Sequence, residues 1–219
     1  MKKLFILLVL TVLLLTACAA PTVTPAATAQ PDAEPTQGPA AVPESPAASE
    51  EPDAFTRDVP MHIHEGLLVT LRMHGRHLGT GDGYVRIEVL GEDGALVQNL
   101  SIADAIRSQW GDGAPGDSTE FAAGQDGYAM MDVNFDGMCD LALDGWMTAG
   151  ANLPRYYWVW DDAAQRFVYS FCLSNVEVDK VNQLLITEER ESASVTVTTV
   201  YQWQNGALCP ISRTENEGS

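Results

Sequence analysis

Apolar residues recur at every second position through most of the chain after residue 58, and this spacing restricts the fold more than any other feature. A period of two puts alternate side chains on opposite faces of a strand, whereas a helix needs a period of about 3.6. The clearest runs are 67–73, 85–89 and 195–199. Turn-forming residues separate such runs every 8–12 residues or so, which is typical of all-β domains. We therefore predict a single antiparallel all-β domain, a sandwich or a small propeller-like fold.

Local signals predict three hairpins and one helix. Asn205-Gly206 suits a primed hairpin turn, because both residues tolerate positive φ. A short helix is predicted around Ile102–Gln109, because Ser101 can cap its first turn. The predicted hairpins pair 86–89 with 95–100, 156–160 with 166–171, and 200–203 with 207–211.

Residues 1–17 have the pattern of a secretory signal peptide, with Lys2 and Lys3 before an apolar run. The run Leu4–Leu15 is shorter than the roughly 20 apolar residues of a bilayer-spanning helix. The segment Leu15-Thr16-Ala17-Cys18 resembles the lipobox of bacterial lipoproteins. That resemblance implies cleavage before Cys18, a diacylglyceryl group on its sulfur and a further acyl chain such as palmitate. We therefore expect a lipid-anchored protein at the cell membrane, facing outside the cytoplasm. The alternative is a secreted protein with a chance cysteine.

Residues 18–57 form a predicted disordered linker. They hold most of the prolines and are rich in Ala, Thr, Glu and Gln, with Phe55 as their only aromatic residue. Such a segment buries too little apolar surface to offset the entropy of ordering. The ordinary composition of 58–219 then predicts one domain with a core of its own, at roughly 160 residues.

The chain is strongly acidic, with a formal charge of −18. Loss of Lys2 and Lys3 with the leader takes −18 to −20 and leaves Lys180 as the only lysine. A nucleic-acid-binding protein needs a basic face that displaces counterions from phosphates. This charge excludes that class, and it suits divalent cations and basic protein partners.

Three cysteines lie in the domain: Cys139, Cys172 and Cys209. Export to an oxidising compartment allows one disulfide with one thiol left over, in any of three pairings. They can equally be small buried hydrophobes. A thiolate zinc site is disfavoured because no CxxC pair occurs.

The segment 132–141 has the spacing of a calcium-binding loop. Calcium takes about 6–8 hard oxygen ligands, and a glycine at position 6 lets a short loop turn its donors onto one point. Here that glycine is Gly137. The alternative is an acidic turn without metal. The predicted ligands are the side chains of Asp132, Asn134, Asp136 and Asp140 and the carbonyl of Met138.

An EF-hand loop is excluded, because position 12 is Leu143 rather than Glu and the flanks 128–131 and 141–143 predict strands. The segment instead resembles the strand-flanked D-x-[DN]-x-D-G-x-x-D-L loops of FG-GAP and integrin-like repeats. Val133 and Phe135 are expected to point into the core. A closed cage of oxygen ligands predicts a structural role for calcium rather than a catalytic one.

All four histidines lie within a short segment: His62, His64, His74 and His77. On a strand, His62 and His64 share a face, and a hairpin can bring His74 near them. These residues form a candidate second metal site, for a transition metal. The alternative is that they are exposed residues near the edge of the sheet.

Two arrangements that suggest catalysis are incomplete. Gly116-Asp117-Ser118 resembles the nucleophile segment of GDSL hydrolases, but no histidine follows His77 to act as its base. Asp161 and Asp162 fit a turn better than a catalytic pair, because adjacent side chains point to opposite faces of a strand. We therefore expect a protein that is not an enzyme.

Five of the aromatic residues in the predicted hairpin 156–171 form a candidate binding face. They can line a glycan-binding face, or they can belong to the core, which the strand pattern favours. They are Tyr156, Tyr157, Trp158, Trp160 and Phe167.

The domain from about Tyr84 to Thr214 resembles a family of bacterial exported proteins and lipoproteins typified by a calcium-binding lysozyme inhibitor. The resemblance implies an all-β, calcium-stabilised, non-catalytic protein at the cell surface or in the periplasm. It is carried, in order along the chain, by the loop 132–141, the strand 156–161, Arg166-Phe167, the segment 176–179 with Asn182, and the hairpin 201–208.

From these features we expect a membrane-anchored β-domain that binds a protein or cell-wall partner, such as a peptidoglycan hydrolase. An acidic surface complements a basic hydrolase. The alternative is a solute- or glycan-binding surface lipoprotein.

Overall fold

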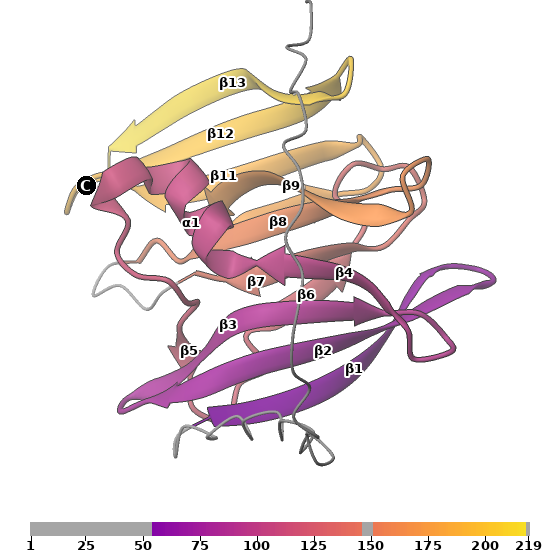
Figure 1. Cartoon of the computed structure of the whole chain (residues 1–219). Coiled ribbons are helices and arrows are strands. Elements are labelled where there is room, and N and C mark those ends of the chain that lie inside the picture. The colour runs from indigo at the N-terminus through magenta and orange to yellow at the C-terminus, as the bar shows by residue number, and fades with distance from the viewer. Residues whose placement is uncertain (1–53, 146–150, 218–219) are drawn as a thin grey trace, which may run out of the picture. The chain divides into compact units, whose positions relative to one another are not determined.

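The period-two runs form strands, and the strands assemble into three antiparallel sheets, with no closed barrel within the described ranges (Figure 1). This computed structural model describes residues 54–145 and 151–217. All of them belong to one compact unit, Ala48–Ser219. The all-β prediction is confirmed. The leader, Cys18 and most of the predicted linker lie outside the described residues.

Sheet A, as we name it, is built from the first part of the unit. Its four long strands pair in chain order, and a fifth, short strand pairs with the start of the third. The strands are β1 (Ala54–His64), β2 (Leu67–Leu78), β3 (Gly81–Leu90), β4 (Leu96–Ser101) and β5 (Phe121–Ala122).

Sheets B and C repeat this plan, since in each of them four consecutive strands pair in chain order. Sheet B holds β6 (Tyr128–Met131), β7 (Asp140–Asp144), β8 (Pro154–Asp161) and β9 (Arg166–Ser174). Sheet C holds β10 (Val176–Asp179), β11 (Leu184–Arg190), β12 (Val195–Gln204) and β13 (Ala207–Glu217).

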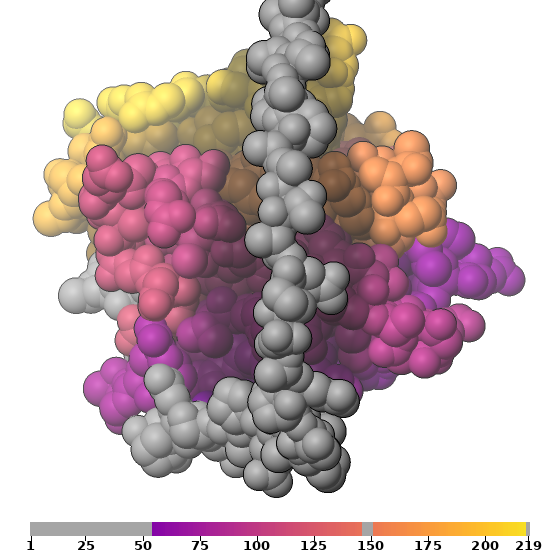
Figure 2. All heavy atoms as spheres, in the orientation of Figure 1, coloured from indigo at the N-terminus to yellow at the C-terminus, as the bar shows by residue number. Residues whose placement is uncertain are grey.

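Sheet B is the middle layer. Leu141 and Tyr156 pack in one core cluster with residues of sheet A, such as Leu71. Their neighbours Ala142 and Tyr157 pack in a second cluster with Leu185 of sheet C. Figure 1 shows the three sheets as successive layers, and Figure 2 shows their atoms in the same order, from the indigo and magenta of sheet A to the yellow of sheet C. Burial on both faces explains the continuous apolar runs in β7 and β8, where strict alternation is lost.

The helix α1 (Ile102–Trp110) follows β4 directly, and a short 3-10 turn, Gly111–Gly113, ends it. Ser101 caps its first turn by accepting a hydrogen bond from the backbone N–H of Asp104 at 3.2 Å. Ile102 and Ile106 are buried against the core. The predicted helix and its cap are confirmed.

The domain begins earlier than residue 58. Strand β1 starts at Ala54, and Phe55 pairs with Gly75 of β2. The Phe55 ring packs edge-on against Tyr84, with ring centroids 6.0 Å apart. The predicted boundary at residue 58 therefore falls inside β1, because Pro52 and Pro60 make the alternation of Phe55, Arg57 and Val59 hard to recognise in the sequence.

Candidate functional site

The predicted metal loop connects β6 to β7 on sheet B. Its flanking strands are Tyr128–Met131 and Asp140–Asp144, so the expected strand-flanked context is confirmed. Gly137 has φ 86°, in the left-handed region that side chains other than glycine rarely adopt. Phe135 also has a positive φ, 63°. These two residues let the chain reverse within a few positions.

Three side chains of the loop accept hydrogen bonds from its own backbone. Asn134 Oδ1 accepts the N–H of Asp136 at 3.3 Å. Asp132 Oδ2 accepts a hydrogen bond from the N–H of Gly137 at 3.0 Å. Asp136 Oδ1 accepts one from the N–H of Met138 at 2.8 Å, and its Oδ2 accepts one from the Asn134 amide at 2.7 Å. The side chains of Asp132 and Asp136 are therefore held against the backbone of the loop itself.

Asp132 Oδ1 is buried and has no hydrogen-bond partner among the described residues. A buried carboxylate oxygen without a donor costs free energy, and a cation beside it relieves that cost. The donors are all oxygens, which is the chemistry that calcium prefers. The donor type and this orphaned oxygen are the two features of the loop that suit calcium.

Asp140 has a second role that its place in the loop does not predict. Its Oδ2 accepts the N–H of Val133 at 2.8 Å, and its Oδ1 accepts the N–H of Trp160 on β8 at 2.9 Å. The side chain is fully buried. Burial raises the pKa of Asp140 to about 7, although both N–H donors act to lower it. Asp140 thus ties the loop to the middle of sheet B.

The carboxylates of Asp132, Asp136 and Asp140 do not converge on one point in this structure. Across residues 54–145 and 151–217, no three His, Cys, Asp or Glu side chains lie close enough together to hold a metal ion. Calcium would have to displace the hydrogen bond between Asn134 and Asp136 to draw both side chains onto one ion.

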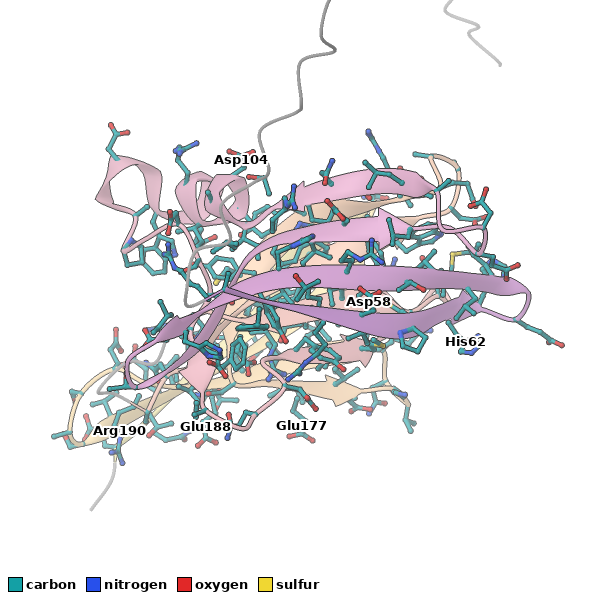
Figure 3. The ribbon with its side chains drawn as sticks, turned by 60° about the horizontal axis from the view of Figure 1, so that its bottom comes forward. Asp58, His62, Asp104, Glu177, Glu188 and Arg190 are labelled. Carbon is teal, nitrogen blue, oxygen red and sulfur yellow. The ribbon has the colours of Figure 1, made fainter. Side chains whose placement is uncertain are left out.

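The four histidines do not come together. His62 faces Leu68 across the β1–β2 hairpin, near its turn (Figure 3). His74 lies six positions further along β2, about 20 Å away at the rise of a strand. It contacts Glu88, with its Nε2 atom 3.3 Å from the carboxylate, while His77 bonds to Asp82. The expected four-histidine site is not assembled, because the hairpin register places the two pairs at opposite ends.

Cys139, Cys172 and the aromatic cluster belong to the packing of the core. Cys139, Cys172 and Cys209 are all free. The five aromatic residues of β8 and β9 named above are at most 3% exposed. They are core residues, and β8 offers no aromatic platform to a ligand.

Ser118 is held by an arginine. Its hydroxyl accepts a hydrogen bond from Arg76 at 3.0 Å, and the same guanidinium binds Asp117. The segment 116–118 is thereby fastened to β2. Asp161 ends β8 and Asp162 begins the turn that follows, and both accept local hydrogen bonds within this turn segment.

The clefts of the domain were not predicted from the sequence, and two of them bear on its function. One, of about 890 Å³, lies between the end of α1, β9 and sheet C. The other, of about 520 Å³, lies beside the metal loop and includes Asp136 and Trp203 in its walls. Both combine segments far apart in the chain, so no local pattern signals them.

Comparison of the chain with models of protein families, with curated proteins and with solved structures found no match. The family resemblance therefore stays a prediction. No helix among the described residues is long and apolar enough to cross a membrane.

Proposed function

We propose that this protein is a lipid-anchored lipoprotein whose calcium-stabilised, non-catalytic β-domain binds a protein partner outside the cytoplasm, such as a peptidoglycan hydrolase. The observation that carries the proposal is the loop 132–140, in which Asp132 and Asp136 accept hydrogen bonds from the loop backbone and the buried Asp132 Oδ1 has no partner among the described residues. The signal pattern before Cys18 supports the anchor.

In this proposal calcium is held by the side chains of Asp132, Asn134, Asp136 and Asp140 and the carbonyl of Met138. The ion supplies positive charge that neutralises the repulsion among clustered carboxylates. The chain's own contribution is the fixed loop, since Gly137 permits the turn and Asp140 anchors it to β8. Bound calcium would stabilise the connection between β6 and β7 of sheet B.

The metal is tested by thermal unfolding of the mature chain with and without calcium, using a Cys18→Ala form that is not lipidated. We expect calcium to raise the melting temperature of the wild type and to have no effect on Asp136→Ala, because ligand binding to the native state alone stabilises it. Asp93→Ala is the matched control, since Asp93 also accepts a hydrogen bond within a turn. An unchanged wild-type melting temperature in calcium contradicts the proposal.

The partner class is tested by adding the calcium-loaded domain to lysozyme during hydrolysis of peptidoglycan. We expect inhibition that saturates with domain concentration and weakens in high salt, because an acidic surface would bind a basic enzyme. A panel of muramidases that all keep full activity would contradict the hydrolase partner.

The anchor is tested by fractionation of cells that express the wild type or Cys18→Ala. We expect the wild type in the membrane fraction and the variant to be lost from it.

One observation favours the alternative, a solute- or glycan-binding lipoprotein. The cleft of about 890 Å³ has the size of a small-molecule site, roughly 300–1,000 Å³. Its walls include Trp110 and Tyr201, and Trp110 is 44% exposed. Titration with cell-wall saccharides, followed by tryptophan fluorescence of the wild type and of Trp110→Phe, tests this alternative.

A further inference from the structure

The cleft beside the metal loop lies where three separate segments of the chain meet. Its walls come from the loop itself, from the adjoining ends of β8 and β9, and from the β12–β13 turn. It has a volume of about 520 Å³, which is large enough for one long side chain. It thus opens between sheets B and C, at the end of these layers that carries the loop.

The floor of the cleft is apolar and fixed in place. Val159 and Val168 line it from sheet B, and Val168 is 41% exposed. Trp203 lines it from sheet C. Its indole N–H donates to the carbonyl of Val133 at 2.7 Å, and its ring packs edge-on against Phe171 with centroids 6.0 Å apart. A ligand would therefore meet a preformed apolar surface rather than one that must be ordered on binding.

The rim of the cleft is acidic. Asp161 Oδ1 accepts the N–H of Ala164 at 3.1 Å, and Asp162 Oδ1 accepts the Gln165 amide at 2.7 Å. These bonds fix both carboxylates and leave the Oδ2 atom of each available to another donor. Asp136 adds a third acidic side chain, and none of the described residues that line the cleft is basic.

We propose that this cleft receives an arginine side chain of a basic partner protein. The methylene stem of an arginine would cover Val159 and Val168, and its guanidinium would reach Asp161 and Asp162 while contacting the Trp203 ring. The acidic rim favours a cationic occupant. It repels anionic groups, and a neutral group would leave the rim carboxylates without a counter-charge. The inference rests on the proposed function and names the contact that a basic partner would make.

Calcium in the loop is compatible with this occupant. Calcium would engage Asp136, whereas Asp161 is the last residue of β8 and Asp162 follows it in the turn, both outside the loop. Two carboxylates thus stay available to the arginine when the metal is bound. For that reason the test is made on the calcium-loaded domain.

The test compares Asp161→Asn/Asp162→Asn with Glu92→Gln/Asp93→Asn in the unlipidated mature chain. The control pair also consists of adjacent acidic residues in a hairpin turn, and it changes the net charge equally. The probe is a tri-arginine peptide, with tri-citrulline as its uncharged counterpart, and binding is measured by calorimetry. We expect the first variant to weaken tri-arginine binding by about tenfold, the control to change it less than about twofold, and tri-citrulline not to bind.

Equal weakening by both variants would show attraction by net charge alone and would overturn the inference. The absence of saturable tri-arginine binding to the wild type would overturn it as well.

Lysozyme inhibition by the same proteins separates this inference from the proposed function. If Asp161→Asn/Asp162→Asn inhibits as well as the wild type, the cleft is not the contact and the proposed function stands. If site-specific tri-arginine binding occurs without inhibition of any muramidase, the cleft stands and the hydrolase partner fails.

Discussion

The side-chain amide of Gln98 forms two hydrogen bonds to the backbone of Phe167. Gln98 Nε2 donates to the Phe167 carbonyl at 2.8 Å, and the Phe167 N–H donates to Gln98 Oε1 at 2.9 Å. Gln98 lies on β4 of sheet A, and Phe167 lies on β9, at the edge of sheet B. One side chain therefore replaces a neighbouring strand at this edge and joins two layers.

We expect Gln98→Ala to lower the free energy of unfolding by about 1–3 kcal/mol, because two backbone groups of Phe167 lose their partner. Urea denaturation followed by tryptophan fluorescence measures the change. Asn99→Ala is the control, since the neighbouring side chain is exposed on the same strand. Equal stability of Gln98→Ala and the control would contradict this role.

Asp140→Ala is expected to destabilise the calcium-free domain by about 2–4 kcal/mol, because it leaves the N–H groups of Val133 and Trp160 unpaired in the core. The measurement is urea denaturation in the presence of a calcium chelator, so that metal binding does not contribute. Asp140→Asn keeps one acceptor and should lose less. A variant Asp140→Ala as stable as the wild type would mean that Asp140 serves the metal alone.

The domain is expected to lose stability between pH 10 and pH 12. The buried hydroxyl of Tyr84 donates to the carbonyl of Asp126 at 2.6 Å, and burial raises its pKa to about 12. The unfolded chain releases this proton near its ordinary pKa of 10, while the native state keeps it. Since the native state then binds more protons, its stability falls as pH rises through this interval. Urea denaturation across the interval should give a shallower fall for Tyr84→Phe, and an identical fall would contradict the prediction.

The thiol of Cys172 is expected to resist alkylation until the domain unfolds. Burial raises its pKa to about 12, so the reactive thiolate is scarce. The comparison uses chains that keep only Cys172 or only Cys209, with the other cysteines changed to serine. Iodoacetamide should label Cys209, on the edge strand β13, sooner than Cys172. In the Cys18→Ala form, which keeps the other three cysteines, unfolding without reductant should expose three free thiols, and a missing label would reveal a disulfide.

Several elements followed from local rules that act within a few residues. The Asn205-Gly206 turn has φ values of 52° and 79°, as a primed hairpin turn requires. The β3–β4, β8–β9 and β12–β13 hairpins pair as expected. The loop 132–140 lies between strands, as its spacing indicated. These features are predictable because both partners of each contact are close in the chain.

The layer order and the clefts were not predictable in this way. The sequence of Tyr156–Trp158 does not show that its alternate residues face two different sheets. Their environment depends on sheets A and C, which pack on the two faces of sheet B. The separation of His62 from His74 depends likewise on the register of β1 against β2.

The sequence alone determined the all-β class, the hairpins, the capped helix and the position of the loop that we propose to bind calcium, since each rests on periodicity or spacing within a short segment. Only the tertiary structure decided that sheet B is buried on both faces, that Gln98 serves β9, and that Asp140 ties the loop to Trp160. It also placed Trp203 beside Asp161 and Asp162 in one cleft. Such contacts join residues tens of positions apart, and only the packing of the three layers brings them together.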